Sequence, residues 1–247
     1  MFSPFDLPPE MLLLVTDQLS SPADFVVYRG VIDHLKPPAS GKPKRAIVLS
    51  ASPEFARWKA IAAKSNLPLE PLVANGSFTF IDILERVKPP DDASDTSPRL
   101  LPILEAVSSA LQSDADTLVV VDDLATLDWL GFSVLDLTRF CRALYAACRK
   151  TNATLLLRQH VLTPSGPDLV LDDLSRALRQ LCTYHLEVLP LASGRSGAVS
   201  GQVALHAGPA LAVPQDVKLL PRSAALQYKL TDSGAVFFQR GTGAGVL

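Results

Sequence analysis

A short apolar segment that ends in two adjacent carboxylates constrains this chain more than any other feature. Residues 117–123 read Thr-Leu-Val-Val-Val-Asp-Asp, so four consecutive apolar residues precede Asp122 and Asp123. Continuous apolar runs of this length are typical of parallel strands that are buried on both faces. The pattern therefore predicts a strand inside an α/β sheet, with both acids at its carboxyl end.

Other apolar runs alternate with segments of helical periodicity. Strands are expected at 11–16, 46–50, 78–81, 117–122 and 154–158, and helices over 22–35, 53–65, 100–112 and 133–150. The rest of the chain predicts a helix over 172–182 and strands at 185–190, 202–206, 226–230 and 235–239. This alternation indicates an α/β, doubly wound, mostly parallel sheet with antiparallel strands at the carboxyl-terminal end.

The loop after the first expected strand lacks the chemistry that such a sheet often carries. In ATPases of the RecA type, an acid at a strand end orients magnesium beside the phosphates, and a Gly-x-x-x-x-Gly-Lys-Ser/Thr loop holds them. Here residues 17–23 contain no glycine and no lysine, and no Gly-Lys-Ser/Thr occurs in the chain. Asp122 and Asp123 are therefore expected to cap a helix or bind a loop backbone more often than a metal.

Composition limits the other classes of function. The chain has 247 residues, is 48% hydrophobic and carries a net charge of −2, so we expect one domain over 1–247 and no strong general affinity for nucleic acid. The three cysteines form no Cys-x-x-Cys pair and the four histidines form no cluster, so neither a disulfide framework nor a metal site is expected. Residues 88–98 hold three prolines and three aspartates and predict a disordered insertion.

Two groups of apolar side chains are candidate subunit contacts. Leu127, Trp129 and Leu130 follow the acid pair in a segment that we expect to be a loop, although each could equally tuck under the next helix. The carboxyl-terminal strands carry Tyr228 as well as Phe237 and Phe238, and alternation places the two phenylalanines on opposite faces.

Basic residues offer only weak candidates for RNA contacts. His160 directly follows the fifth expected strand, where RecA-like proteins meet nucleic acid, but a structural histidine is the commoner outcome. Arg195 lies in a Ser/Gly-rich segment. Arginines at 139, 142 and 149 share one expected helix, as a basic strip or as a solvated face paired with acids.

The chain resembles the Elongator complex protein 6 family in two segments. Residues 120–131 read Val-Val-Asp-Asp-Leu-Ala-Thr-Leu-Asp-Trp-Leu-Gly, and residues 226–241 read Leu-Gln-Tyr-Lys-Leu-Thr-Asp-Ser-Gly-Ala-Val-Phe-Phe-Gln-Arg-Gly. Similar segments recur in that family together with a RecA-like order of elements and a missing phosphate loop.

The resemblance implies a RecA-like subunit of a hexameric ring that contains two copies each of this chain and of the fourth and fifth Elongator subunits. The ring would bind tRNA, associate with the catalytic Elongator subcomplex and support wobble-uridine modification in tRNA. On this reading the chain is not an enzyme, needs no cofactor, and is cytoplasmic or nuclear with no membrane contact. The alternative is a divergent RecA-like ATPase that uses Asp122 or Asp123.

Overall fold

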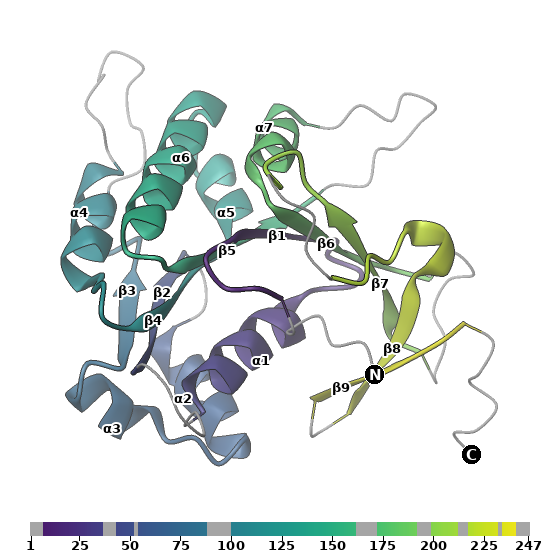
Figure 1. The fold of residues 1–247 in the computed structure, drawn as a ribbon, viewed down its shortest axis with the longest axis horizontal. Coiled ribbons are helices and arrows are strands. Elements are labelled where there is room, and N and C mark those ends of the chain that lie inside the picture. The colour runs from purple at the N-terminus through teal and green to yellow at the C-terminus, as the bar shows by residue number, and fades with distance from the viewer. Residues whose placement is uncertain are drawn as a thin grey trace.

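Nine strands form one sheet in the order β3-β2-β4-β5-β1-β6-β7-β8-β9 (Figure 1). The computed structural model describes residues 7–36, 43–51, 54–87, 100–161, 172–191, 199–211, 217–231 and 234–240. The strands are β1 (Leu12–Asp17), β2 (Lys44–Ser50), β3 (Phe78–Asp82), β4 (Asp116–Asp122), β5 (Thr154–His160), β6 (Tyr184–Leu189), β7 (Gly201–Ala207), β8 (Leu226–Thr231) and β9 (Gly234–Phe238). The segment 88–98 and Arg195 lie outside the described residues.

Seven α-helices are described in these ranges, together with one short 3-10 helix, η1. They are α1 (Asp24–Leu35), α2 (Phe55–Lys64), α3 (Leu69–Ala74), α4 (Leu101–Ala110), α5 (Leu124–Trp129), α6 (Val134–Lys150) and α7 (Asp173–Leu181), with η1 at Arg222–Ala224. None of the described helices is long and apolar enough to cross a membrane.

The expected sheet is confirmed. The six strands from β3 to β6 in the sheet order pair in parallel, and β7, β8 and β9 continue the sheet through antiparallel pairs. The order of the parallel strands places β1 between β5 and β6, so that the carboxyl ends of β4, β5 and β1 meet at one edge. Open α/β sheets bind their ligands at that edge.

Helices cover both faces of the parallel part of the sheet (Figure 1). Strand alternation sends Leu13 and Val15 of β1 toward α1, α2 and α3, whereas Leu12 and Leu14 point toward α4, α5, α6 and α7. This three-layer arrangement with a mostly parallel sheet is a RecA-like fold. Two separate aliphatic cores therefore lie on the two sides of one sheet.

Helix α6 illustrates how well the apolar periodicity predicts burial. Its inward stripe of side chains at helical spacing is buried: Leu137, Cys141, Leu144 and Cys148. Burial raises the pKa of Cys141 and of Cys148 to about 12, so both thiols stay protonated and unreactive near neutral pH.

The structure corrects one expected loop. Residues 124–131 do not form an exposed loop, because α5 begins at Leu124, directly after β4. The side chain of Asp123 caps this helix by accepting a hydrogen bond from the Thr126 amide at 2.8 Å. Leu127 consequently turns into the core and is fully buried. Helix α3 was also missed, because six residues are too few to show a helical period.

Candidate functional site at the carboxyl edge of the sheet

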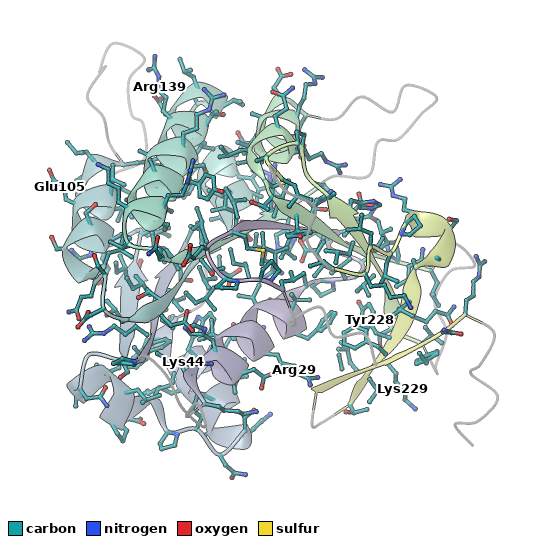
Figure 2. The ribbon with its side chains drawn as sticks, in the orientation of Figure 1. Arg29, Lys44, Glu105, Arg139, Tyr228 and Lys229 are labelled. Carbon is teal, nitrogen blue, oxygen red and sulfur yellow. The ribbon has the colours of Figure 1, made fainter. Side chains whose placement is uncertain are left out.

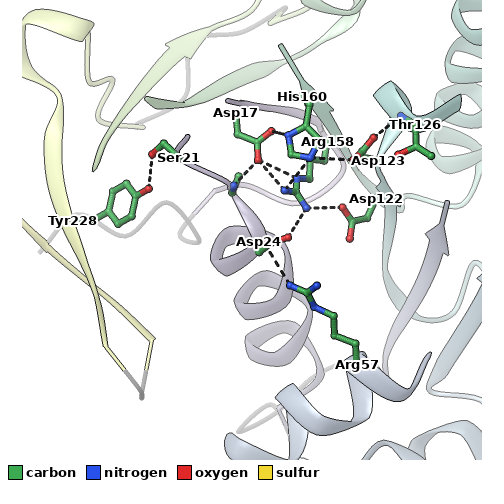
Figure 3. A network of polar contacts seen from close by, with 11 residues as sticks. Asp17, Ser21, Asp24, Arg57, Asp122, Asp123, Thr126, Arg158, His160 and Tyr228 are labelled. Atoms are coloured by element: carbon green, nitrogen blue, oxygen red, sulfur yellow. Dashed lines mark hydrogen bonds and ion pairs between the residues drawn. The ribbon is translucent and has the colours of Figure 1, made fainter. Parts of the chain in front are cut away.

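Polar side chains gather at the carboxyl edge of the sheet, on the side covered by α1 (Figure 3). The register pairs Val15 of β1 with Arg158 of β5, and Val121 of β4 with Leu157 of β5. Because side chains alternate along a strand, Asp17 of β1, Asp122 of β4 and the β5 residues Arg158 and His160 point to the same face of the sheet. We call this group the Arg158 cluster; its members are Asp17, Asp24, Asp122, Asp123, Arg158 and His160.

Arg158 is the centre of the cluster. Its guanidinium donates to Asp17 Oδ2 from Nη2 at 2.9 Å, and from Nη1 to Asp24 Oδ1 and Asp122 Oδ1 at 2.8 Å each. The Arg158 side chain is only 4% exposed, and those of Asp17 and Asp122 are 0% and 1% exposed. Burial alone would lower the pKa of Arg158, but the carboxylates outweigh it and raise that pKa. Arg158 is therefore a permanent, internally neutralised cation.

His160 bridges Asp17 and one further carboxylate, Asp123. Its Nδ1 lies 2.6 Å from Asp17 Oδ1, and its Nε2 lies 3.2 Å from Asp123 Oδ2. Burial favours the neutral imidazole, but the contacts with Asp123 and Asp17 outweigh burial and raise the pKa of His160 to about 9. Burial would also raise the pKa of Asp123, yet the bonds from His160 and the Thr126 amide hold that pKa below its usual value. The pair is therefore an imidazolium beside a carboxylate at neutral pH.

The loop that follows β1 is closed by its own hydrogen bonds. Asp17 Oδ2 accepts the Ala23 amide at 2.5 Å, directly before α1, and Ser21 Oγ lies 2.8 Å from Tyr228 Oη of β8. Gly201 lets these groups approach, since a Cβ there would lie 2.6 Å from Ser21 Oγ. A loop held in this way does not present a row of free amides to a phosphate.

The expected interface residues after β4 divide into three environments. Leu127 is buried in the core and Leu130 is half-buried, so Leu127 is wrong as a surface contact. Trp129 is 56% exposed, and its ring lies parallel to that of His160, with centroids 6.4 Å apart. Trp129 thus joins the exposed surface of the sheet edge to the Arg158 cluster.

The carboxyl-terminal aromatics also separate. Tyr228 is 1% exposed and packs on Phe25 with ring centroids 4.5 Å apart, so its expected role as a surface contact is wrong. Phe237 packs on the same side, 6.3 Å from Phe25. Phe238 is half-buried and, by strand alternation, lies on the opposite face together with Val236, which is 54% exposed.

The sequence did not reveal Arg158 as a site residue. The only signal was an arginine at the end of an apolar strand, which also fits a strand that has reached the surface. Its acidic partners Asp17 and Asp122 are 141 and 36 residues away. Their meeting depends on β5 lying between β4 and β1, which spacing along the chain does not determine.

A second ionic cluster lies on the other face of the sheet. Glu187 of β6 is 2% exposed and accepts two hydrogen bonds from Arg222, at 2.7 and 2.8 Å. It also accepts from His206 Nε2 at 2.9 Å and from Arg179 at 3.3 Å. Burial would raise the pKa of Glu187, but the hydrogen bonds from Arg222 and His206 and the nearby His185 lower it to about 2. We call these four residues the Glu187 cluster.

His185 lies beside the Glu187 cluster and has the opposite protonation from His160. Its Nε2 lies 2.8 Å from Thr16 Oγ1, and its ring centroid is 5.8 Å from that of His206. Burial, together with the charge of Arg179, lowers the pKa of His185 to about 3. His185 is therefore neutral at any pH near 7.

The nucleotide that a RecA-like fold implies does not fit the residues present at this edge. A phosphate would meet the carboxylate of Asp17 where a phosphate loop offers amides and a lysine. Across the described part of the chain, no group of three or more His, Cys, Asp and Glu side chains is arranged to hold a metal ion. Fold and site together define a RecA-like protein whose phosphate position is filled by its own side chains.

Comparison with known proteins places this chain in a family. The model of the family described as Elongation complex protein 6 matches residues 2–232, and the chain belongs to that family. Elongator complex protein 6 of Danio rerio is 25% identical, over 99% of this chain and 96% of that protein. The protein of the same name from Xenopus laevis is 27% identical over 78% of each chain, and that of Xenopus tropicalis is 26% identical over 78% and 79%. The relatives are thus named as subunits of the Elongator complex.

Proposed function

We propose that this chain is a non-catalytic subunit of the Elongator accessory ring, a heterohexamer with the fourth and fifth subunits. In that role it supports tRNA binding and wobble-uridine modification by the assembled complex, in the cytoplasm or the nucleus. The Arg158 cluster is the observation that carries the proposal. A RecA-like subunit whose phosphate position is filled by its own buried charged side chains keeps the shape of a ring subunit but does not bind and hydrolyse a nucleotide.

The alternative, a divergent ATPase, has weaker support. Such an enzyme would use Asp122 or Asp123 to orient magnesium. Asp122 Oδ1 is instead 2.8 Å from Arg158 Nη1, and Asp123 holds both the first turn of α5 and His160. Freeing either acid for a metal would take one carboxylate partner from buried Arg158 or from His160, which is costly. The arrangement favours a structural role for both acids.

The partner surface that we propose lies at the same sheet edge. Trp129 is exposed beside the Arg158 cluster, and aromatic side chains are common anchors of interfaces. Its ring lies parallel to that of His160, so an anchoring contact here would sit directly beside the Arg158 cluster. Phe238 and Val236 form a second candidate contact on the outer face of the β8–β9 hairpin.

We assign RNA contacts to the assembled ring rather than to one copy of this chain. A net charge of −2 cannot release many counterions, whereas several modest basic surfaces around one ring act together. Arg139, which points away from the sheet in Figure 2, shares the exposed face of α6 with Arg142 and Arg149. His160 is the other candidate near the sheet edge, although Asp17 and Asp123 lie against both of its ring nitrogens. Arg195 is a further candidate.

Native mass spectrometry of the chain co-expressed with the fourth and fifth subunits tests the assignment. We expect a heterohexamer with two copies of each chain, and tighter tRNA binding by that ring than by this chain alone. A chain that remains monomeric beside an assembled pair of the other two subunits would contradict the proposal. Equal tRNA affinity of the lone chain and the ring would contradict the composite RNA surface.

A further inference from the structure

The carboxylate of Asp17 accepts three hydrogen bonds through Oδ2, while its Oδ1 faces His160 as an ion pair without hydrogen-bond geometry. Its Oδ2 accepts from the Ala23 amide at 2.5 Å and from Arg158 Nε and Nη2 at 3.2 and 2.9 Å. Its Oδ1 lies 2.6 Å from His160 Nδ1. A backbone amide at the start of a helix, a guanidinium that binds through two nitrogens and an imidazolium are the groups with which proteins hold phosphate.

The donors are fixed by contacts that do not involve Asp17. Arg158 Nη1 is held separately by Asp24 and Asp122, so the edge of the guanidinium formed by Nε and Nη2 faces Asp17 alone among these acids. His160 is held by Asp123 through its other nitrogen. The Ala23 amide is fixed by α1, whose first turn begins one residue later. Removing the Asp17 carboxylate should therefore leave these donors without their acceptor while keeping them in their positions.

We infer that Asp17 is a built-in ligand of an anion site, and that this site takes a small tetrahedral oxyanion such as phosphate once the carboxylate is removed. The position lies after the first strand, where phosphate-binding members of this fold class hold their ligand. In this chain the side chain of Asp17 supplies the negative charge that the phosphate of a nucleotide supplies in those proteins. This inference concerns the isolated chain and goes beyond its proposed membership of the ring.

The test uses the full chain with Asp17→Ala and inorganic phosphate as the probe. Removing Asp17 takes the acceptor from Arg158 Nε and Nη2 and the nearest carboxylate from His160 Nδ1, while Asp24, Asp122 and Asp123 keep their contacts, so binding of phosphate should offset part of the loss. We expect phosphate to raise the Tm of Asp17→Ala by about 2–4 °C more than it raises that of the wild type, measured against chloride at equal ionic strength. The double variant Asp17→Ala, Arg158→Met should lose this additional response.

Two further variants separate the site from general effects. Phosphate stabilises many proteins by exclusion from their surfaces, so Asp33→Ala is the matched control: it removes a carboxylate from α1 that is 32% exposed and pairs with Lys36. Should Asp17→Ala not fold in chloride, recovery of its folding by phosphate supports the inference. The neutral variant Asp17→Asn, which keeps an acceptor for the Ala23 amide, provides a second measurement of the rise in Tm with phosphate. Equal rises in Tm with phosphate for the Asp17 variants, Asp33→Ala and the wild type overturn the inference. If Asp17→Ala does not fold in chloride, the inference is also overturned when phosphate fails to refold it and Asp17→Asn shows no additional rise in Tm.

Discussion

The Arg158 cluster and the Glu187 cluster use the same kinds of side chain with opposite balances of charge. In the first, four carboxylates surround one arginine and one histidine, and in the second, two arginines and one histidine surround one carboxylate. Consecutive residues of β1 reach toward the two regions, because Asp17 contacts His160 on one face and Thr16 contacts His185 on the other. One histidine is held charged and the other neutral.

The two clusters also differ in how much water reaches them. The Arg158 side chain is 4% exposed, and its partners Asp17 and Asp122 are fully buried. Glu187 is equally buried, but the side chain of Arg222 is 62% exposed and that of His206 is 33% exposed. Water can therefore replace a lost partner in the Glu187 cluster, whereas around Arg158 it reaches only the side of Asp24, which is 35% exposed. This difference predicts how each cluster responds to substitution.

The largest effect is expected from Arg158→Met. The substitution keeps most of the volume of the side chain but leaves buried Asp122 without its cation and Asp17 with His160 alone, which should cost on the order of 3–5 kcal/mol of unfolding free energy. Urea denaturation of the variant measures the loss. Arg142→Met, on the exposed face of α6, is the matched control and should stay within about 0.5 kcal/mol of the wild type. A loss below about 1 kcal/mol for Arg158→Met would show that the cluster does not hold the sheet edge together.

The next effect concerns binding to the partner subunits at the exposed surface beside the Arg158 cluster. Trp129→Ala removes the exposed ring beside His160 and should weaken assembly with the partner subunits by about 2 kcal/mol, roughly thirtyfold. Circular dichroism should show an unchanged fold. Val73→Ala, an exposed apolar position on α3, controls for the loss of surface area. Normal assembly of the Trp129 variant would move the interface elsewhere, and unfolding would make Trp129 a structural residue.

A smaller loss is expected from Glu187→Gln. The amide keeps the shape of the side chain and one acceptor oxygen, while water can solvate the exposed parts of Arg222 and His206. We expect a cost of about 1–2 kcal/mol by urea denaturation. A cost equal to or greater than that of Arg158→Met would reverse the comparison, because the two clusters would then not differ in solvation.

Above neutral pH, the pH dependence of stability should depend on His160 and not on His185. His160 faces Asp17, Asp123 and Arg158, and its pKa is about 9 in the folded chain against an ordinary value of 6.5. Its stabilisation is therefore complete below pH 6.5 and is lost as the pH rises from 6.5 to 9. We expect a decline of at most about 3 kcal/mol over that range, which His160→Gln should remove. An unchanged alkaline decline in the variant would exclude His160 as its source.

On the acid side the sign is opposite. The folded pKa of His185 is about 3, below its ordinary 6.5, so the neutral ring stabilises the fold above pH 6.5 and loses that effect as the pH falls toward 3. Glu187, with a folded pKa of about 2 against 4.5, adds its own loss from pH 4.5 downward. His185→Gln should weaken the loss between pH 6.5 and 4.5 and leave the lower part in place. The same decline in the variant would place its origin outside His185.

The sequence predicted the sheet well because apolar runs and alternation are local patterns. Leu137 and Cys141 lie in the core on the face of α6 that the helical period of apolar residues indicates. Leu127 was misplaced because a six-residue helix is too short to show a period, although Asp123 three residues before Thr126 was a cap signal. The partners of Arg158 and the burial of Tyr228 depend on which strands are neighbours, and no local pattern carries that information.

Calorimetric titration of the purified chain with ATP and magnesium tests the central claim most directly. If Asp17 and Arg158 already fill the phosphate position, no binding should be detected at micromolar concentrations. Tight binding to the lone chain, lost when residues 17–23 are altered, would contradict the account.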